Sequence, residues 1–436
     1  MREMKNSGVA WIGDIPENWK VLRNKNLIYE INERCTDTTD LPLLSVSEYY
    51  GVAPRADKIH DGQIVSRAET FEGYKICHQD DVVMNIMLAW KRAQAVSSFN
   101  GIVSPAYCVY RKKNNSKLDM TFFNYLIRSD LYISVFKRFS TGIIDSRLRL
   151  YPEKFLALHS HVPPTYEQHK IAKHLNKACN NIENLINNQE QQIEKLKQYK
   201  QSLITEVVTK GLNPDVPMKD SGVKWIGQIP EEWNLTSVRY IGSLQNGISK
   251  SGEAFGTGYP FVCYGDIYKN YELPTMVAGL VETNEKEREQ YSVEYGDVFF
   301  TRTSETIEEV GFSCVCKQTI SNATFAGFVI RMRPYKADEK ILTNFAKYYF
   351  RGSQIRAYLV KEMNLVTRAS LGQTLLKGMS VTIPPKEEQQ QIATYLDNKC
   401  AKIDRLIAIK QEKINKLNDY KKSLIYEYVT GKREVC

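Results

Sequence analysis

Two long stretches of the chain place apolar residues at alternating steps of four and three positions. One stretch follows Pro163-Pro164 and the other follows Pro384-Pro385, and a proline pair is typical of the start of a helix rather than of its interior. Neither stretch is interrupted by Gly or Pro for about 42 residues. The pattern predicts two long helices, each with an apolar stripe wide enough to be covered by a partner helix.

An apolar stripe of this length must be buried, and the simplest partner for each helix is the other one. We expect the two helices to pack antiparallel, because each is followed by a return to a globular region. A coiled-coil dimerisation element unrelated to DNA is the alternative. The candidate partner-binding residues lie in the two stripes and are Leu175, Ile182, Leu196, Ile403 and Leu417.

The chain also repeats itself, which is the strongest feature of the sequence. Lys5–Trp19 returns as Lys219–Trp233 with 11 of 15 positions identical, at a shift of 214 residues. Residues 162–209 return as residues 383–430 with 22 of 48 positions identical. Identity at this level indicates an internal duplication.

Between the repeated blocks the two halves diverge, and only short β-branched and aromatic runs correspond. Val82-Val83-Met84 is similar to Val298-Phe299-Phe300, and both runs predict strands. The predicted fold class is α+β: two α/β recognition domains separated by two long antiparallel coiled-coil helices, with an internal pseudo-twofold duplication. The predicted boundaries are 1–161 for the first recognition domain, 162–213 for the first helical region, 214–382 for the second recognition domain and 383–436 for the second helical region.

Composition narrows the class of protein only slightly. The 436 residues carry a formal net charge of +9, which permits a polyanionic partner without demonstrating one. No window approaches 18 consecutive apolar residues, and the N-terminus is polar, so we expect no membrane span and a cytoplasmic protein. The nine cysteines are scattered and lack the spacing of a zinc site or a disulfide framework.

Several catalytic motifs are missing from the sequence. There is no Walker A motif, no dinucleotide-binding glycine loop, and no Asn-Pro-Pro-aromatic or Asp-Pro-Pro-aromatic run of an adenine methyltransferase. His169 and His174 are five positions apart, a poor spacing for one face of a helix. We therefore expect no catalytic residue, no metal and no cofactor in this chain.

Candidate DNA-binding residues combine cations, hydroxyls and aromatics, which suit phosphates and base edges. They follow predicted strands or precede the last strand of each half, at matching places in two diverged regions. The candidates are Trp90, Lys91, Arg92, Arg147 and Arg149 in the first half, and Arg302, Thr303 and Arg368 in the second half.

Two motifs, each present twice, carry a family resemblance that covers essentially the whole chain. The opening Ser-Gly-x-x-Trp-Ile-Gly-x-Ile-Pro-Glu-x-Trp and the segment Pro-Pro-x-x-Glu-Gln-x-x-Ile resemble the specificity subunit of Type I restriction–modification systems. The run from Gly296 to Arg302 is similar to a strand and loop of that family. The first half departs from it, with Asp80 for the glycine and Ile86 near the arginine position.

The resemblance implies a role without catalysis. One specificity subunit would join two methyltransferase subunits, and two ATP-driven restriction subunits can add. Each recognition domain would read one half of a bipartite double-stranded DNA target, while the paired helices set the gap and dock the methyltransferases. Methylation of adenine N6 from S-adenosylmethionine would occur in the partner. A coiled-coil scaffold or adaptor without sequence reading is the alternative, and a stand-alone nuclease or methyltransferase is opposed by the missing motifs.

Overall fold

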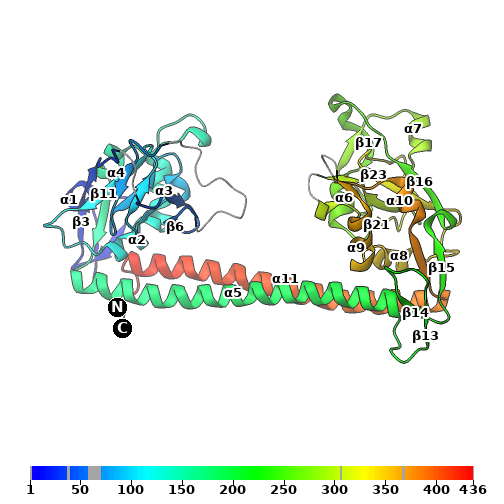
Figure 1. The fold of residues 1–436 in the computed structure, drawn as a ribbon. Helices are drawn as coiled ribbons and strands as arrows, with labels where there is room; N and C mark the ends of the chain where they lie inside the picture. The colour runs from blue at the N-terminus through cyan, green and yellow to red at the C-terminus, as the bar shows by residue number, and fades with distance from the viewer. Residues whose placement is uncertain (1, 37–39, 57–69, 305–306, 366–368, 436) are drawn as a thin grey trace. The chain divides into compact units, whose positions relative to one another are not determined.

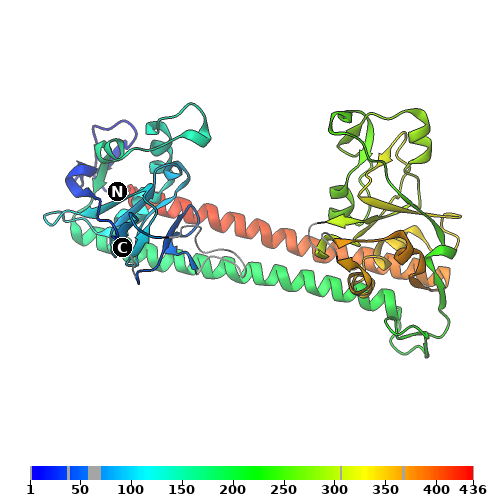
Figure 2. The same ribbon diagram turned by 45° about the horizontal axis from the view of Figure 1, so that its top comes forward.

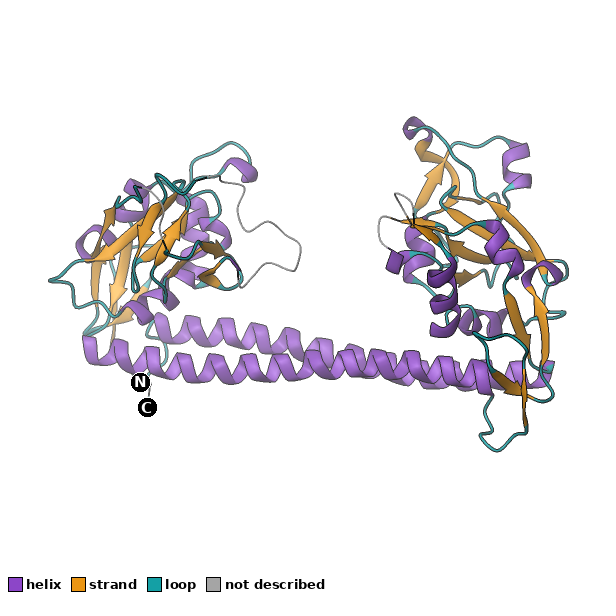
Figure 3. Cartoon of the chain, in the orientation of Figure 1, coloured by secondary structure: helices purple, strands orange, loops and turns teal. Residues whose placement is uncertain are grey.

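The computed structural model describes residues 2–36, 40–56, 70–304, 307–365 and 369–435. The fold mixes helices and short strands, with two long helices, as Figure 3 shows. The chain divides into two compact units. The first unit contains Met1–Gln189 and Glu412–Cys436, and the second contains Glu190–Gln411. At this level the predicted α+β class with two long helices is confirmed.

The two long helices start where the proline pairs predict. Helix α5 (Thr165–Lys210) has 46 residues and helix α11 (Lys386–Val429) has 44 residues. Gly211 has φ +80° and Gly431 has φ +72°, a left-handed backbone that ends a helix and that glycine adopts without steric cost. Both ends therefore follow from the sequence.

Within each unit the two helix segments run antiparallel. Figures 1 and 2 show α11 alongside α5. The cross-helix contacts pair rising numbers on α5 with falling numbers on α11: His174 with Tyr428 and Glu183 with Lys421 in the first unit, and Gln192 with Lys410 and Lys200 with Asp404 in the second.

Each unit is built around an antiparallel four-stranded sheet, and the two sheets have the same strand order. In the first unit the order is β4 (Ile28–Ile31), β11 (Tyr107–Lys112), β8 (Val82–Asn85) and β9 (Gln94–Val96). In the second unit it is β16 (Gly242–Asn246), β23 (Val329–Pro334), β19 (Val298–Thr301) and β21 (Ser313–Val315). The two runs that predict strands, Val82-Val83-Met84 and Val298-Phe299-Phe300, lie in β8 and β19.

The repeated N-terminal motif forms the same local structure in both units. It folds into a β-hairpin, followed by a strand that pairs with the strand leading into the proline pair. In the first unit these elements are β1 (Met4–Asn6), β2 (Asp14–Pro16), β3 (Lys20–Arg23) and β12 (His159–Val162). In the second unit they are β13 (Met218–Asp220), β14 (Gln228–Pro230), β15 (Asn234–Ser237) and β26 (Ser380–Ile383). The two ends of each diverged region thus meet at the start of a long helix.

The remaining elements differ between the units. The first unit adds the strands β5 (Leu44–Ser47), β6 (Gly51–Pro54), β7 (Lys75–Cys77) and β10 (Gly101–Val103), and the helices α1 (Asn24–Leu27), α2 (Met120–Arg128), α3 (Asp130–Phe139) and α4 (Pro152–Ala157). The second unit adds the strands β17 (Phe255–Val262), β18 (Gly279–Val281), β20 (Thr303–Ser304), β22 (Thr324–Phe325), β24 (Asn364–Leu365) and β25 (Ala369–Ser370). Its shorter helices are α6 (Tyr264–Lys269), α7 (Glu285–Gln290), α8 (Thr343–Tyr349), α9 (Ser353–Glu362) and α10 (Gln373–Gly378).

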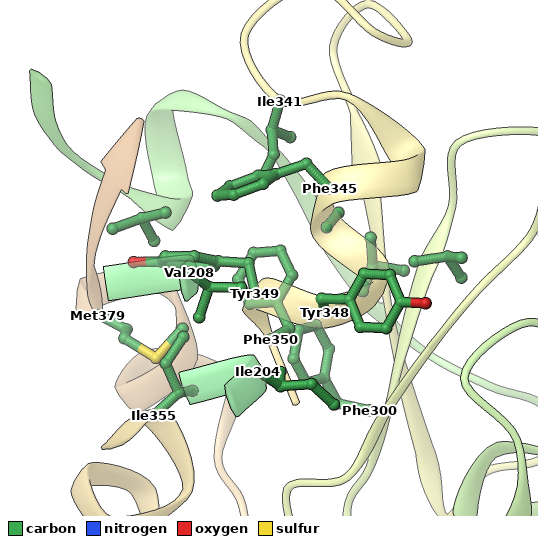
Figure 4. Packing of buried hydrophobic residues seen from close by; sticks show 14 of the residues in the cluster. Ile204, Val208, Phe300, Ile341, Phe345, Tyr348, Tyr349, Phe350, Ile355 and Met379 are labelled. Atoms are coloured by element: carbon green, nitrogen blue, oxygen red, sulfur yellow. The ribbon is translucent and has the colours of Figure 1, made fainter. Parts of the chain in front are cut away.

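The long helices bury their apolar stripes against the globular part of each unit as well as against each other. Figure 4 shows Ile204 and Val208 of α5 packed with Phe345, Tyr349 and Phe350, and all five belong to one buried cluster. In the first unit the corresponding cluster contains residues of α5, α11, α2 and the repeated N-terminal motif. Each helix pair is thus part of a domain core, which anchors the globular part of the unit to it.

Candidate nucleic-acid interface

Trp90 lies between two cations in the connection from β8 to β9. It belongs to a short 3-10 helix, Ala89–Lys91, and its indole Nε1 donates a 3.1 Å hydrogen bond to the carbonyl of Met87. The ammonium groups of Lys91 and Lys137 each lie 5.0 Å from a Trp90 ring centroid, within cation–π range. Lys91 is exposed and Trp90 half-buried, so an aromatic edge and a charge reach the surface together.

Arg92 is engaged within the chain. Its backbone is left-handed at φ 67°, which is uncommon for a residue with a side chain. Its Nε donates to the carbonyl of Arg128 at 3.1 Å, and its guanidinium forms an ion pair with Asp130. Burial lowers the pKa of Arg92. The side chain therefore holds the β8–β9 connection against the N-terminal end of α3.

The loop between α3 and α4 brings Arg147 and Arg149 to the same part of the first unit. Thr141 and Arg149 exchange two backbone hydrogen bonds of 2.9 and 3.0 Å, which close the loop, and both arginine side chains are exposed. Lys137 links the loop to the ring of Trp90, because its ammonium also donates to Asp145 at 3.0 Å. Four of the first-half candidates thus lie on two connected loops.

In the second unit the predicted loop contains Arg302 and Thr303. Arg302 is half-buried, and its Nη1 lies 3.4 Å from the carbonyl oxygen of Gly327. Thr303 opens the short strand β20, and its hydroxyl lies 3.4 Å from that of Ser370 on β25. Arg368 lies outside the described residues.

A shared backbone contact shows which positions of the two units correspond. The N–H of Leu150 donates to the carbonyl of Ile86 at 2.9 Å, and the N–H of Leu371 donates to the carbonyl of Arg302 at 2.8 Å. Ile86 and Arg302 therefore lie at equivalent positions. The second unit has a basic side chain there, whereas the first unit has an apolar one.

Sequence reasoning did not single out the exposed aromatic next to Arg302. The backbone N–H of Arg302 donates to the carbonyl of Phe328 at 2.9 Å, and Phe328 is 60% exposed. A large ring that remains this exposed beside a basic loop suits stacking or contact with a thymine methyl. The available signal was its place immediately before Val329-Ile330, a β-branched pair that favours a strand.

Two buried ion pairs show which arginines belong to the structure of the sheets. Arg111 binds both carboxylate oxygens of Asp81 at 3.0 Å, and Arg333 binds both oxygens of Asp297 at 2.7 Å. Both carboxylates are buried, and burial raises the pKa of Asp297 although Arg333 acts against that shift. These side chains fasten β11 to β8 and β23 to β19.

The predicted partner-binding residues are packed inside the chain. Leu175, Ile182 and Ile403 are buried, and Leu196 and Leu417 pack at the edges of the same clusters. The large exposed apolar side chains of the two helices lie at two pairs of equivalent positions of the repeat and at two further sites: Leu185 and Leu406, Tyr199 and Tyr420, Tyr166 and Ile409.

Among the residues described, no three His, Cys, Asp or Glu side chains are grouped so that they could hold a metal ion. Within the same ranges, no helix has the length and apolar character needed to cross a bilayer.

Comparison with known proteins shows which family part of the chain resembles. Residues 230–419 match the family described as "Type I restriction modification DNA specificity domain". That segment holds most of the second unit together with the helix α11 up to residue 419.

Relatives extend the likeness to the whole chain. The putative type I restriction enzyme MjaX specificity subunit of Methanocaldococcus jannaschii is 23% identical, over 97% of this chain and 96% of that protein. The type I restriction enzyme EcoKI specificity subunit of Escherichia coli K12 is 21% identical, over 96% of this chain and 90% of that protein. The predicted resemblance to Type I specificity subunits is confirmed.

A solved structure shows the same fold. A chain from a study of complex assembly and conformational transition of the type I R-M system superposes with a TM-score of 0.70 at 16% identity. The match covers 95% of this chain and 98% of that one.

Proposed function

We propose that this chain is the DNA specificity subunit of a Type I restriction–modification complex. Residues 1–161 and 214–382 form two recognition domains, and each reads one half of a bipartite double-stranded target. The observation that carries the proposal is that both units contain the same four-stranded sheet, in the same order, while the loops at its edge differ. Two half-sites of different sequence would require different loops for reading, and the same sheet can hold those loops in both units.

Reading in the first domain is assigned to Trp90, Lys91, Arg147 and Arg149, because these residues are grouped and reach the surface. In the second domain it is assigned to Arg302, Thr303 and Arg368. Arg92 contributes by holding its loop, because its guanidinium is engaged with Asp130. Cations of this kind meet phosphates or the acceptors of guanine, and the ring of Trp90 can pack on a base edge or sugar.

The helical regions 162–213 and 383–436 are assigned the roles of spacer and docking surface. We propose an antiparallel coiled coil with a pseudo-twofold axis, in support of which cross-helix contacts pair rising with falling numbers in each unit. Leu185 and Leu406 are both 48% exposed, although they occupy equivalent positions in an apolar stripe. Two equivalent surfaces suit two methyltransferase subunits, to which restriction subunits can add. Adenine methylation belongs to those partners, and this chain carries no catalytic step.

Genome-wide mapping of methylated adenines tests the proposal. Cells with and without the gene are compared, with the methyltransferase subunit present in both. The expected result is one bipartite motif that disappears with the gene. An unchanged methylome, together with no selective DNA binding by the purified complex, would support a scaffold instead. Turnover by the purified chain alone would indicate an enzyme.

A further inference from the structure

A half-buried arginine in the first unit ties two surface segments together through backbone carbonyls. Arg128 is the last residue of α2, and its Nη1 donates to the carbonyls of Arg92 at 3.0 Å and Gln94 at 2.7 Å. Its Nη2 donates to the carbonyl of Glu48 at 3.2 Å and lies 3.5 Å from that of Tyr49. One guanidinium therefore joins the β8–β9 connection to the tip of the β5–β6 hairpin.

The second unit contains the same device. Arg351 lies just after α8 and is 7% exposed. Its Nε donates to the carbonyl of Ser313 on β21 at 2.6 Å. Its Nη2 donates to the carbonyls of Ile267, Tyr268 and Asn270 at 2.7, 3.0 and 2.7 Å. This guanidinium joins the edge strand of the sheet to the end of α6.

Arg128 and Arg351 lie at equivalent positions of the two units. The buried side chain of Gln168 accepts a 2.7 Å hydrogen bond from the N–H of Asp119, and that of Gln389 accepts one of 2.7 Å from the N–H of Leu342. These two N–H groups mark the same point before α2 and α8. Counting from Asp119 and Leu342 along the chain, Arg128 and Arg351 are reached after the same number of residues.

Neither guanidinium has a carboxylate partner among the ion pairs of the described residues. Burial lowers the pKa of Arg128 to about 10 and also lowers the pKa of Arg351. Removing a charge from water without a counterion is costly, and an apolar side chain would fill the same space. The backbone carbonyls that each guanidinium joins are therefore the groups that offset the cost of its burial.

In the first unit the anchored segment presents tyrosines to solvent. Tyr49 is 84% exposed and Tyr50 is 43% exposed. The following residue, Gly51, has φ +79°, and a Cβ there would lie 2.8 Å from Cβ of Ala95 and 3.4 Å from Nη1 of Arg128. The hairpin tip therefore lies directly on the guanidinium, and a side chain at position 51 would push it away.

In the second unit the anchored segment is α6, which carries Tyr264 and Tyr268. The hydroxyl of Tyr264 donates to the carbonyl of Glu309 at 2.8 Å, and the hydroxyl of Thr301 donates to the same oxygen at 2.8 Å. Thr301 directly precedes Arg302. The tyrosine helix thus adjoins the loop to which DNA reading is assigned.

We propose that Arg128 and Arg351 are positioning residues, each of which clamps a second, tyrosine-bearing DNA-reading segment beside the basic loop of its domain. The segments are Tyr49-Tyr50 in the first domain and α6 in the second, where Tyr268 is exposed and Tyr264 ties the helix to the basic loop. A tyrosine ring packs against a thymine methyl or a sugar, and its hydroxyl bonds a base edge or a phosphate. The inference rests on the proposed function and names further specificity-determining residues for it.

The test uses the complex with its methyltransferase subunits. It compares methylation of the cognate site with that of sites carrying one substitution in either half. Tyr49→Ala should lower discrimination in the first half-site about tenfold and leave the second unchanged, because a single base contact is worth about this factor. Arg128→Lys keeps a charge but loses the planar fork that reaches two segments, so it should relax the same half-site. Arg138→Lys, an exposed position in the same domain, is the control and should change nothing.

Arg351→Lys and Tyr268→Ala form the second arm and should relax the second half-site only. A variant that loses total methylation while its discrimination stays at the wild-type value has a structural role alone, and that result overturns the inference. Unchanged discrimination in Tyr49→Ala, whose side chain is too exposed to affect folding, overturns it as well. A wild-type complex that reads no bipartite site would instead overturn the proposed function, and the inference with it.

Discussion

The indole Nε1 of Trp19 donates a 3.1 Å hydrogen bond to the carboxylate of Glu167. The equivalent contact, from Trp233 to Glu388, measures 2.8 Å. Each bond joins the last residue of the repeated N-terminal motif to the glutamate of the repeated Pro-Pro-x-x-Glu-Gln motif. The two motifs recur together because they form the two sides of one contact between a globular region and a long helix.

Breaking this joint should destabilise the first unit. Trp19 and Trp233 are both fully buried, so Trp19→Phe removes ring volume from the core and leaves a buried carboxylate short of a donor. Together these effects should cost about 2–4 kcal/mol of unfolding free energy, measured as a shift in the urea midpoint. Trp233→Phe is the matched variant in the second unit and should cost a similar amount.

A double-mutant cycle with Glu167→Gln separates the hydrogen bond from the loss of ring volume. We expect a coupling energy of about 1 kcal/mol between Trp19→Phe and Glu167→Gln, because the two residues share one charge-assisted bond. Simple additivity of the two single variants would show that the bond contributes nothing beyond packing.

Stability should also depend on pH through His161. This side chain is fully buried, its ring stacks on Trp19, and its Nε2 forms a 2.7 Å hydrogen bond with the carbonyl oxygen of Val429. Burial lowers the pKa of His161 to about 4 from an ordinary value of 6.5. Between these values the unfolded chain binds a proton that the folded chain does not, so the unfolding free energy falls as the pH falls.

The size of the effect follows from the two pKa values. From about pH 7 to about pH 5 this one group should remove about 2 kcal/mol of stability. The second unit has Thr382 at the equivalent position, so His161→Thr supplies a non-titrating variant. The unfolding free energy, obtained from urea titrations at both pH values, should fall from about pH 7 to about pH 5 by about 2 kcal/mol less in the variant than in the wild type. An equal fall in the two proteins would mean that His161 titrates normally in the folded state.

Basic loop residues should act on one half-site each. Arg302→Ala should weaken discrimination in the second half-site by roughly 1–3 kcal/mol if its guanidinium reads a base, and Arg147→Ala should do the same for the first. Binding to cognate and random DNA by the purified complex is the measurement. Lys416→Ala, an exposed residue of α11 paired with Glu412, is the control. Equal loss on both DNAs would make these residues phosphate contacts.

The parts of the structure that could be predicted depend on residues that are close together in the sequence. The proline pairs indicate where α5 and α11 start, and the four-three spacing indicates most of the buried face, with Leu185 and Leu406 as exposed exceptions. The partners of Trp19 and Arg92 could not be predicted, because Glu167 is 148 positions away and Asp130 is 38 positions away. No short stretch of the sequence shows that the guanidinium of Arg92 already forms an ion pair with Asp130.

The same limit hid the two positioning arginines. Arg128 ends α2 and Arg351 lies just after α8, and a basic residue at such a place attracts no notice because cations are common near helix C-termini. Their function is visible only when the carbonyls of a distant hairpin or helix lie on the guanidinium. Their matching positions in the two diverged regions become visible only when the hydrogen bonds of Gln168 and Gln389 align the two regions.

The paired helices should act as a ruler between the two half-sites. Helix α5 contacts α11 through His174 with Tyr428 and Glu183 with Lys421 in the first unit, and through Gln192 with Lys410 and Lys200 with Asp404 in the second. The division between the units falls after Gln189 in α5 and after Gln411 in α11. An insertion in α5 after Gln189 therefore needs a matching one in α11 after Gln411. With an insertion in only one helix, the contacts between α5 and α11 in one of the two units would have to shift by about one helical turn.

Inserting four residues at both points lengthens the pair by about 6 Å and nearly preserves the rotational phase of the apolar stripes. Since DNA rises about 3.4 Å per base pair, the gap in the methylated motif should grow by about one to two base pairs. Two residues at both points would turn each stripe through about 200° and should abolish methylation. Sequencing of methylated adenines in cells that carry each variant is the measurement. After the four-residue insertions, methylation could remain active at both half-sites with the original gap between them. That result would contradict the role of the helices as a rigid spacer.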